Sequence, residues 1–192
     1  MVENPSERKW ILAAIRGDDD AFACLVEVYQ RPVYNLCYRM LGDSAEAEDA
    51  SQEAFMKAYR ALKRYDPNRK FVNWLLSIAS NHSIDRLRKR RLKTTSFEDL
   101  LPGQIKPDPN PGPESRLSMD EGRQSVRDML ETLSELDRAA IVMRYWYDMS
   151  YEEIAESLDL TVSAVKSRLH RARRDMAKEF SPLPAMAFAS GG

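Results

Sequence analysis

The side chains with the clearest chemistry in this chain lie between residues 161 and 174. Val165, Leu169, Ala172 and Met176 recur at spacings of four, three and four, which predicts a helix with one buried stripe. Ser163, Lys166, Ser167, His170, Arg171 and Arg174 fall away from that stripe. Short hydroxyls suit base edges and long cations suit phosphates, so this face could contact nucleic acid. A solvated basic face on an ordinary amphipathic helix is the alternative.

A second short helical pattern precedes this one and favours a DNA-binding arrangement. Ser150 and Glu153 have the spacing of a capping box, which predicts a helix start. Asp159 lies where the chain must turn, and Asp tolerates a left-handed backbone. Thr161 can then cap the following helix. Two capped helices joined by a tight turn, the second of them cationic, indicate a helix-turn-helix.

A second basic cluster lies earlier in the chain. Residues 63–93 hold ten Lys and Arg against two Asp, and residues 161–178 hold six against one, so the remainder of the chain is acidic. Tyr65, Phe71, Trp74, Asn73 and Asn81 lie within the first cluster. Rings stack on unpaired bases and amides pair with base edges, so the cluster could hold single-stranded DNA. The alternative is that the aromatics are core residues and the cations a solvated face.

The composition favours a helical protein of the cytoplasm. The chain has 192 residues, 43% of them hydrophobic, and few glycines. Cys24 and Cys37 lack a metal-binding spacing, so buried reduced thiols are expected, with no metal and no cofactor. The N-terminus has no signal-peptide pattern, and the longest uncharged run, residues 71–84, is too short to cross a membrane.

The chain divides into two predicted helical domains, and the expected fold class is all-α. Helical patterns cover residues 10–16, 22–41, 43–62 and 71–92, with a kink or break expected at Pro32. Residues 107–113 alternate proline with Asp, Asn and Gly, which predicts an extended linker. The expected domains are therefore 1–93 and 118–180, joined by linker 94–117 and followed by a disordered tail, 181–192.

Three stretches resemble the bacterial sigma-70 family of transcription initiation factors. Residues 48–62 and 71–81 resemble its second conserved region, and residues 151–173 resemble its fourth. Because the chain holds only these two regions and a linker, it resembles the small extracytoplasmic-function subgroup. The resemblance implies a factor that binds core RNA polymerase, at the β′ clamp and the β flap, and directs it to promoter DNA. An anti-sigma factor is a further implied partner.

The resemblance also assigns roles to individual residues. The helix around Asp49, Gln52 and Glu53 would dock on polymerase. The expected −10 contacts are Arg64, Arg69, Lys70, Phe71, Asn73, Trp74, Asn81 and Arg88. The expected −35 contacts are Thr161, Ser163, Lys166, Ser167, Arg168, Arg171 and Arg174. No catalytic residue is implied.

Three other functions are alternatives that the sequence supports less well. A stand-alone helix-turn-helix regulator would need a dimer seam or a ligand pocket, and no pattern indicates either. A nucleic-acid enzyme would need clustered carboxylates or metal ligands, whereas His82 and His170 are isolated and Asp18–Asp20 is better explained as a helix cap. A structural adaptor would not explain two separate cation clusters.

Overall fold

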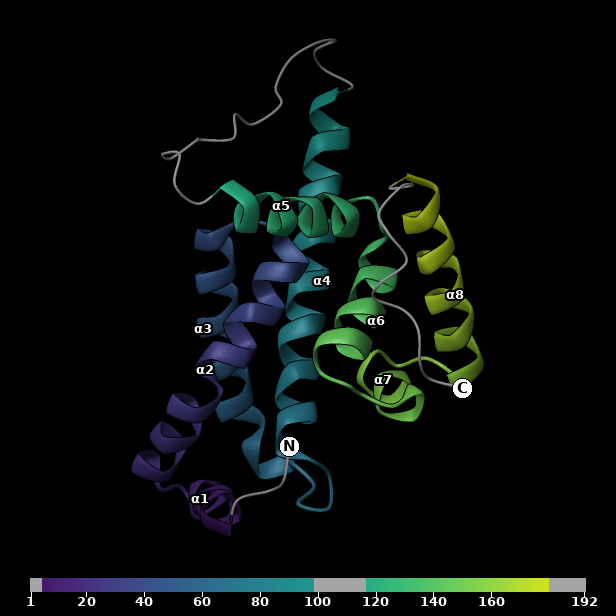
Figure 1. The fold of residues 1–192 in the computed structure, drawn as a ribbon. Helices are drawn as coiled ribbons and strands as arrows, with labels where there is room; N and C mark the ends of the chain where they lie inside the picture. The colour runs from purple at the N-terminus through teal and green to yellow at the C-terminus, as the bar shows by residue number, and fades with distance from the viewer. Residues whose placement is uncertain (1–4, 99–116, 180–192) are drawn as a thin grey trace.

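The computed structural model describes residues 5–98 and 117–179, and every regular element within those ranges is a helix. This confirms the all-α class. The predicted tail, 181–192, and most of the predicted linker lie outside the described residues. In chain order the helices fall into two groups, α1–α4 and α5–α8, and α5 crosses over to pack on α2 (Figure 1). None of the described helices is long and apolar enough to cross a membrane.

The first group contains α1 (Pro5–Ile15), α2 (Asp19–Leu41), α3 (Ser44–Ala61), a 3₁₀ turn (Leu62–Arg64) and α4 (Phe71–Glu98). Aspartate caps begin α2 and α3: Asp18 accepts from the Ala21 N–H, and Asp43 accepts from the Glu46 N–H. Gly42 ends α2 in a left-handed conformation. Alanines of α3 (Ala47, Ala50, Ala54, Ala58) are fully buried, so their small side chains let α3 pack closely on α2 and α4.

Of the kink or break expected at Pro32, the break is not present. The α2 helix continues from Asp19 to Leu41 through the proline. Tyr29, Val33 and Leu36 on either side of it are buried, and this packing holds the helix together although Pro32 supplies no N–H to the ladder. Local propensity is overridden here by tertiary burial.

The second group contains α5 (Leu117–Glu131), α6 (Glu135–Trp146), α7 (Tyr151–Ser157) and α8 (Val162–Glu179). The predicted capping box is present, with Ser150 Oγ and the Glu153 carboxylate each accepting from the other residue's N–H. Asp159 makes the turn at a φ of 53°, and Thr161 Oγ1 accepts from the Ala164 N–H at 3.1 Å. These contacts confirm the predicted helix-turn-helix.

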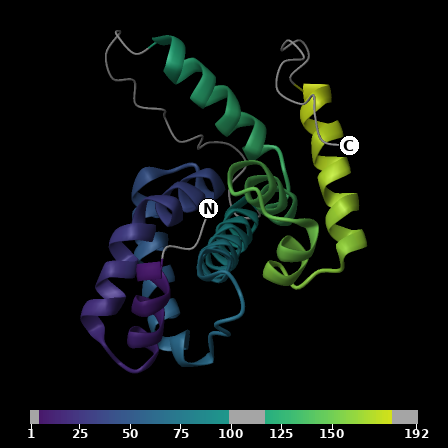
Figure 2. The ribbon, with the colours of Figure 1, turned by 60° about the horizontal axis from the view of Figure 1, so that its bottom comes forward.

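The two groups pack against each other. The α6 helix contacts both α2 and α4, α7 contacts α4, and α5 contacts α2. Figure 2, turned by 60°, again shows α6 and α7 between α4 and α8. We call the contact between the two groups the seam. The α4 helix runs to Glu98 and α5 begins at Leu117, so both enter the range expected to be linker; the domain boundaries remain a prediction.

Candidate nucleic-acid interface

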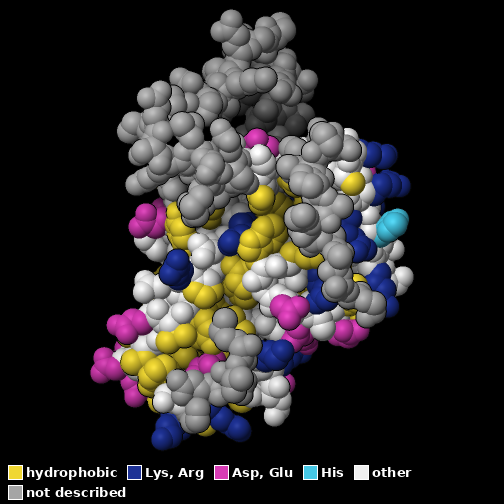
Figure 3. Space-filling model, viewed as in Figure 1, with side chains coloured by type: hydrophobic (Ala, Val, Ile, Leu, Met, Phe, Trp, Pro, Cys, Tyr) yellow, Lys and Arg dark blue, Asp and Glu magenta, His cyan; other side chains and the backbone are white. Residues whose placement is uncertain are grey.

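The outward side of α8 carries the predicted duplex-binding residues. Val165, Leu169 and Ala172 are buried, which turns the cationic side of the helix outward. Exposed side chains there are Thr161, Ser163, Lys166, Ser167, Arg171 and Arg174, which we call the α8 face. Lys and Arg side chains gather along this edge of the molecule (Figure 3). Since a major groove admits one helix, the α8 face has the form that duplex recognition requires.

Arg168 is the predicted contact in this helix that is turned inward. Its guanidinium donates to Asp137 Oδ1 of α6 at 2.9 Å, and Arg171 donates to both oxygens of the same carboxylate. Burial alone would raise the pKa of Asp137, but the hydrogen bonds from Arg171 and Arg168 outweigh it and hold the pKa below its ordinary value. Asp137 therefore stays charged and fixes α8 against α6.

The other predicted DNA-binding residues lie in and around the loop before α4 and along α4 itself. Arg64, Arg69, Lys70, Asn81 and Arg88 are exposed, and Asn73 and Trp74 are partly buried; together these seven form the loop–α4 face.

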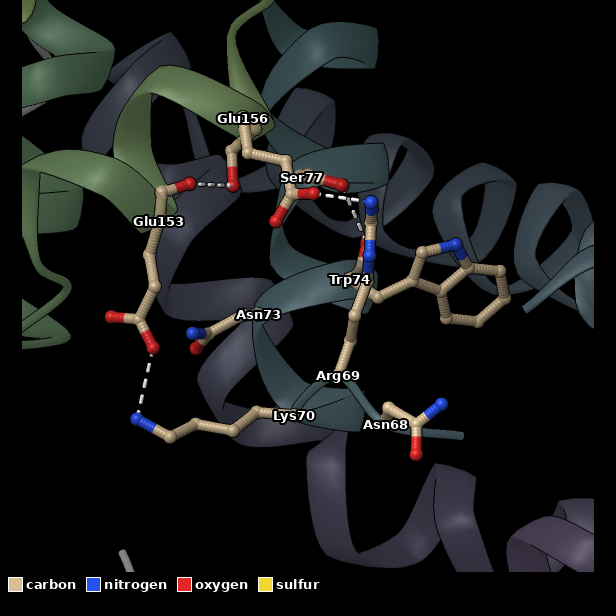
Figure 4. Close-up of a pocket in the computed structure, with 9 residues that line it drawn as sticks. Asn68, Arg69, Lys70, Asn73, Trp74, Ser77, Glu153 and Glu156 are labelled. Atoms are coloured by element: carbon tan, nitrogen blue, oxygen red, sulfur yellow. Dashed lines mark hydrogen bonds and ion pairs between the residues drawn. The ribbon is translucent and has the colours of Figure 1, made fainter. Parts of the chain in front are cut away.

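The aromatic residues of this region form a cluster that supports the loop. Phe71 is only 1% exposed, and its ring contacts those of Tyr29, Tyr65 and Trp74 at 5.3–5.6 Å. It holds the loop rather than presenting a surface on which a base could stack. Trp74 lies at the edge of the cluster, 5.0 Å from Tyr65, and its indole points away from Glu153 (Figure 4). Trp74 is thus the better placed of the two for stacking.

Part of the loop–α4 face lies against α7. Lys70 Nζ is 2.9 Å from Glu153 Oε1, and Arg69 is ion-paired with Glu156 (Figure 4). Asn81 Nδ2 donates to the Ser157 carbonyl at 3.1 Å. Burial would raise the pKa of Glu153, yet hydrogen bonds from the Ser150 N–H, Lys70 and Asn73 outweigh it and lower the pKa. Both helix groups therefore contribute charged groups to one contact.

An open pocket of about 250 Å³ lies at this contact. Asn68, Arg69, Lys70, Asn73, Trp74 and Ser77 line it from the first group, and Glu153, Glu156 and Ser157 line it from the second. Its walls combine an aromatic ring, two amides and two cations with two carboxylates. Among the described residues, no group of three His, Cys, Asp or Glu could hold a metal ion.

The other end of the seam is held by one buried and one partly buried polar contact. The Tyr147 hydroxyl donates to the Pro32 carbonyl at 2.6 Å, and Arg138 donates to the Met40 carbonyl at 2.5 Å, near the C-terminus of α2. A cation suits that end of a helix, where carbonyls lack intrahelical partners. Burial nevertheless lowers the pKa of Arg138, and its Nε has no hydrogen-bond partner. Arg138 is therefore a charge that closure removes from water.

The predicted polymerase-binding residues lie on α3. Asp49, Gln52 and Glu53 are exposed, beside Met56 and Tyr59, which are 49% and 43% exposed. Asp49 lies 3.8 Å from Arg86. The α3 surface thus exposes Met and Tyr side chains, types that are enriched at protein–protein interfaces, with carboxylates beside them.

Sequence reasoning missed Asp137, Arg138 and Tyr147. Asp137 follows Ser134 at N-cap spacing, so a helix start was the only signal it gave. Arg138 and Tyr147 owe their positions to contacts across the seam, and no periodicity within one helix predicts those contacts. Their roles become visible only when the two groups are placed together.

Two family models match the chain in order. The Sigma-70 region 2 model matches residues 25–93, and the Sigma-70, region 4 model matches residues 123–176. The chain is 38% identical to the ECF RNA polymerase sigma factor SigW of Bacillus subtilis over 92% of this chain and 97% of that one. It is 35% identical to the ECF RNA polymerase sigma-E factor of Escherichia coli K12 over 95% and 98%.

Solved structures agree with this arrangement of helices. CnrH, solved in complex with the cytosolic domain of CnrY, has a TM-score of 0.67 and 25% identity, covering 91% of this chain and 96% of that one. RpoE of Bartonella quintana, solved with the anti-sigma factor NepR, has a TM-score of 0.63 and 22% identity, covering 82% and 94%, which supports the fold. On these matches, the chain belongs to the ECF sigma factors of the sigma-70 family.

Proposed function

We propose that this chain binds core RNA polymerase and directs it to promoters by reading two DNA elements. The α8 face reads the −35 element as duplex, and the loop–α4 face reads one strand of the −10 element after melting. The observation that carries this assignment is the order of two sigma-70 regions along one chain, each with exposed cations at its expected DNA-binding positions.

The charge distribution supports a division of labour between surfaces. Cations concentrate on α8 and around the loop before α4, whereas Asp49 and Glu53 on α3 are acidic. An acidic surface repels DNA and suits docking on the polymerase clamp, so the three surfaces need not compete. Because phosphate contacts weaken with salt, each reader alone binds weakly, and polymerase raises the effective concentration of one for the other.

The proposed function also has consequences for intrinsic activity, location and regulation. The chain carries no activity of its own, works in the cytoplasm beside polymerase, and is silenced by an anti-sigma factor. Purified protein should not cleave DNA when Mg²⁺ is added. A stand-alone regulator would instead bind duplex sites as a dimer without polymerase.

Transcription in vitro over a promoter library, with core polymerase and the purified chain, tests the proposal. Comigration with core polymerase and transcripts from a defined set of start sites are expected. Arg88→Glu in the loop–α4 face and Lys166→Glu in the α8 face should each lower those transcripts about tenfold while comigration persists. Arg8→Glu, an equal charge reversal at an exposed position of α1, is the matched control.

Glu53→Lys tests the polymerase-binding surface separately. It should weaken comigration while the DNA-reading faces stay unaltered. Failure of the wild-type chain to associate with core polymerase, or full promoter binding without polymerase, would contradict the proposed function.

A further inference from the structure

Four of the residues expected to read the −10 strand face a single short helix of the chain's other half. Glu153 accepts from Lys70, Glu156 pairs with Arg69, the Ser157 carbonyl accepts from Asn81, and Asn73 lines the same pocket as Glu153. Both carboxylates are thus paired with cations that would otherwise bind the phosphates of a DNA strand. The contact spans residues more than 70 positions apart in the sequence, so local chain geometry does not impose it.

We propose that α7 is an intramolecular cover for the loop–α4 face, in which Glu153 and Glu156 take the place of DNA phosphates. This inference rests on the proposed −10 role of that face. In the closed arrangement the cations are neutralised and the pocket is walled by α7. The free protein therefore binds single-stranded DNA weakly, and opening of the seam, for instance on polymerase, exposes this reader. Within residues 5–98 and 117–179, no carboxylate of the first group pairs with the α8 face.

The seam has the properties of a contact that can open. Lys70 and Arg69 remain 60% and 51% exposed, and so does half of Glu156, so water and salt screen both ion pairs. At the other end, the buried Arg138 regains water when the seam opens. These polar contacts of the seam are ones that a competing polyanion or a docking protein can replace, while apolar packing of α6 on α2 and α4 also contributes to closure.

Glu153 also explains how the cover is kept in register. Its second carboxylate oxygen accepts from the Ser150 N–H at 2.8 Å, completing the capping box of α7. The side chain that caps α7 is therefore the one that reaches Lys70. Gln also completes a capping box, so Glu153→Gln removes the charge while retaining the helix start.

The test compares two double variants that remove the same charge from the same segment. Glu153→Gln with Glu156→Gln removes both carboxylates from the seam. Glu152→Gln with Asp159→Asn removes two exposed carboxylates of the same helix and its turn, and Asn retains the left-handed backbone at 159. Both are made in the full chain, and circular dichroism checks that each retains its helix content.

Two measurements decide the outcome. The affinity for a fluorescein-labelled (dT)12 strand is expected to rise about tenfold for the seam variant over its control, as for a binding-competent state that is about one-tenth populated. The radius of gyration from X-ray scattering is expected to increase for the seam variant only. Equal (dT)12 affinities of the two double variants, or a seam variant as compact as wild type, would overturn the proposal.

Neither measurement needs polymerase, so this inference and the proposed function can fail separately. Promoter-directed transcription with unchanged (dT)12 affinity would leave the sigma role intact and remove the cover. A higher (dT)12 affinity of the seam variant, with no promoter-directed transcription by the chain, would support α7 as a cover for a single-strand-binding face. That result would refute the promoter role.

Discussion

The two cationic faces of this chain differ in what neutralises them. On α8, the buried Asp137 pairs with the inward Arg168 and with Arg171, while Lys166 and Arg174 project outward. On the loop–α4 face, Lys70 and Arg69 are paired across the seam with residues of α7. Asp137 stabilises packing within the second helix group, whereas Glu153 and Glu156 form ion pairs between the two groups. The number of cations therefore does not determine which face is available to DNA.

The free energy that the seam's polar contacts contribute depends on how exposed their side chains are. An ion pair that is half exposed contributes about 0–1 kcal/mol, and a buried neutral hydrogen bond contributes about 1 kcal/mol. By contrast, each helix group buries many apolar side chains at about 1.5–3 kcal/mol apiece. The polar contacts of the seam are therefore weak beside that burial, although the buried apolar residues of the two groups form one continuous cluster. We expect the two groups to behave as separate folding units.

Leu169→Ala should have the largest effect and tests that separation directly. Leu169 is 3% exposed in the second group, and Leu75 is fully buried in the first. Truncating either should cost about 2–5 kcal/mol in its own group. Hydrogen exchange measured by mass spectrometry should quicken in α6–α8 for Leu169→Ala and in α2–α4 for the matched Leu75→Ala. Equal quickening throughout the chain would show one cooperative unit and would break the comparison.

Asp137→Asn should have the next largest effect, confined to the second group. Loss of the carboxylate leaves Arg168 and Arg171 without their partner, which should cost about 1–3 kcal/mol at neutral pH. Because folding lowers the pKa of Asp137, its contribution is present above the ordinary pKa and is lost as pH falls through the folded value. The difference from wild type in urea unfolding should be full at pH 7 and shrink at low pH.

Asp175→Asn is the matched control for that experiment. Asp175 is 45% exposed and lies 3.4 Å from Arg174, so its removal should change the free energy of unfolding by less than about 1 kcal/mol. A stability difference between Asp137→Asn and wild type that persists undiminished at pH 2 would contradict the role of the charge.

Local patterns were sufficient to predict the helices, and they failed where the two halves meet. The stripe of Val165, Leu169 and Ala172 and the caps at Ser150 and Thr161 are encoded within a few residues, so the helix-turn-helix was predictable. The continuity of α2 through Pro32 was not, because burial of Tyr29, Val33 and Leu36 decides it.

The same division holds for the candidate site. The cations on α8 and around the loop were found by charge and spacing, yet their pairing with Glu153 and Glu156 depends on contacts between segments far apart in sequence. Phe71 likewise counts as a possible stacking residue until the rings of Tyr29, Tyr65 and Trp74 are seen around it. The sequence alone shows which residue types are present, but it does not indicate which other segments pack against them.

Tyr147→Phe should open the seam more modestly than the paired glutamine substitutions. It removes only the hydroxyl that donates to the Pro32 carbonyl, at a cost of about 1 kcal/mol to closure. The affinity for (dT)12 should rise by up to about fivefold, with unchanged unfolding of the first helix group. Tyr34→Phe, which keeps the ring stacked on Tyr38 of the same helix, is the control and should leave the affinity unaltered.

The smallest expected effect lies in the salt dependence of binding, and it distinguishes the two faces most sharply. Each phosphate contact contributes about 0.9 to the slope of log affinity against log salt for duplex DNA, and about 0.7 for a single strand. Lys166→Ala should lower the duplex slope equally in wild type and in the Glu153→Gln, Glu156→Gln variant, because nothing in the seam neutralises Lys166. Arg69→Ala should lower the (dT)12 slope in that variant but hardly at all in wild type, where Glu156 already occupies the guanidinium. Equal slopes for Arg69→Ala in both backgrounds would mean that the strand displaces Glu156 without cost, so that the two faces differ in position but not in availability.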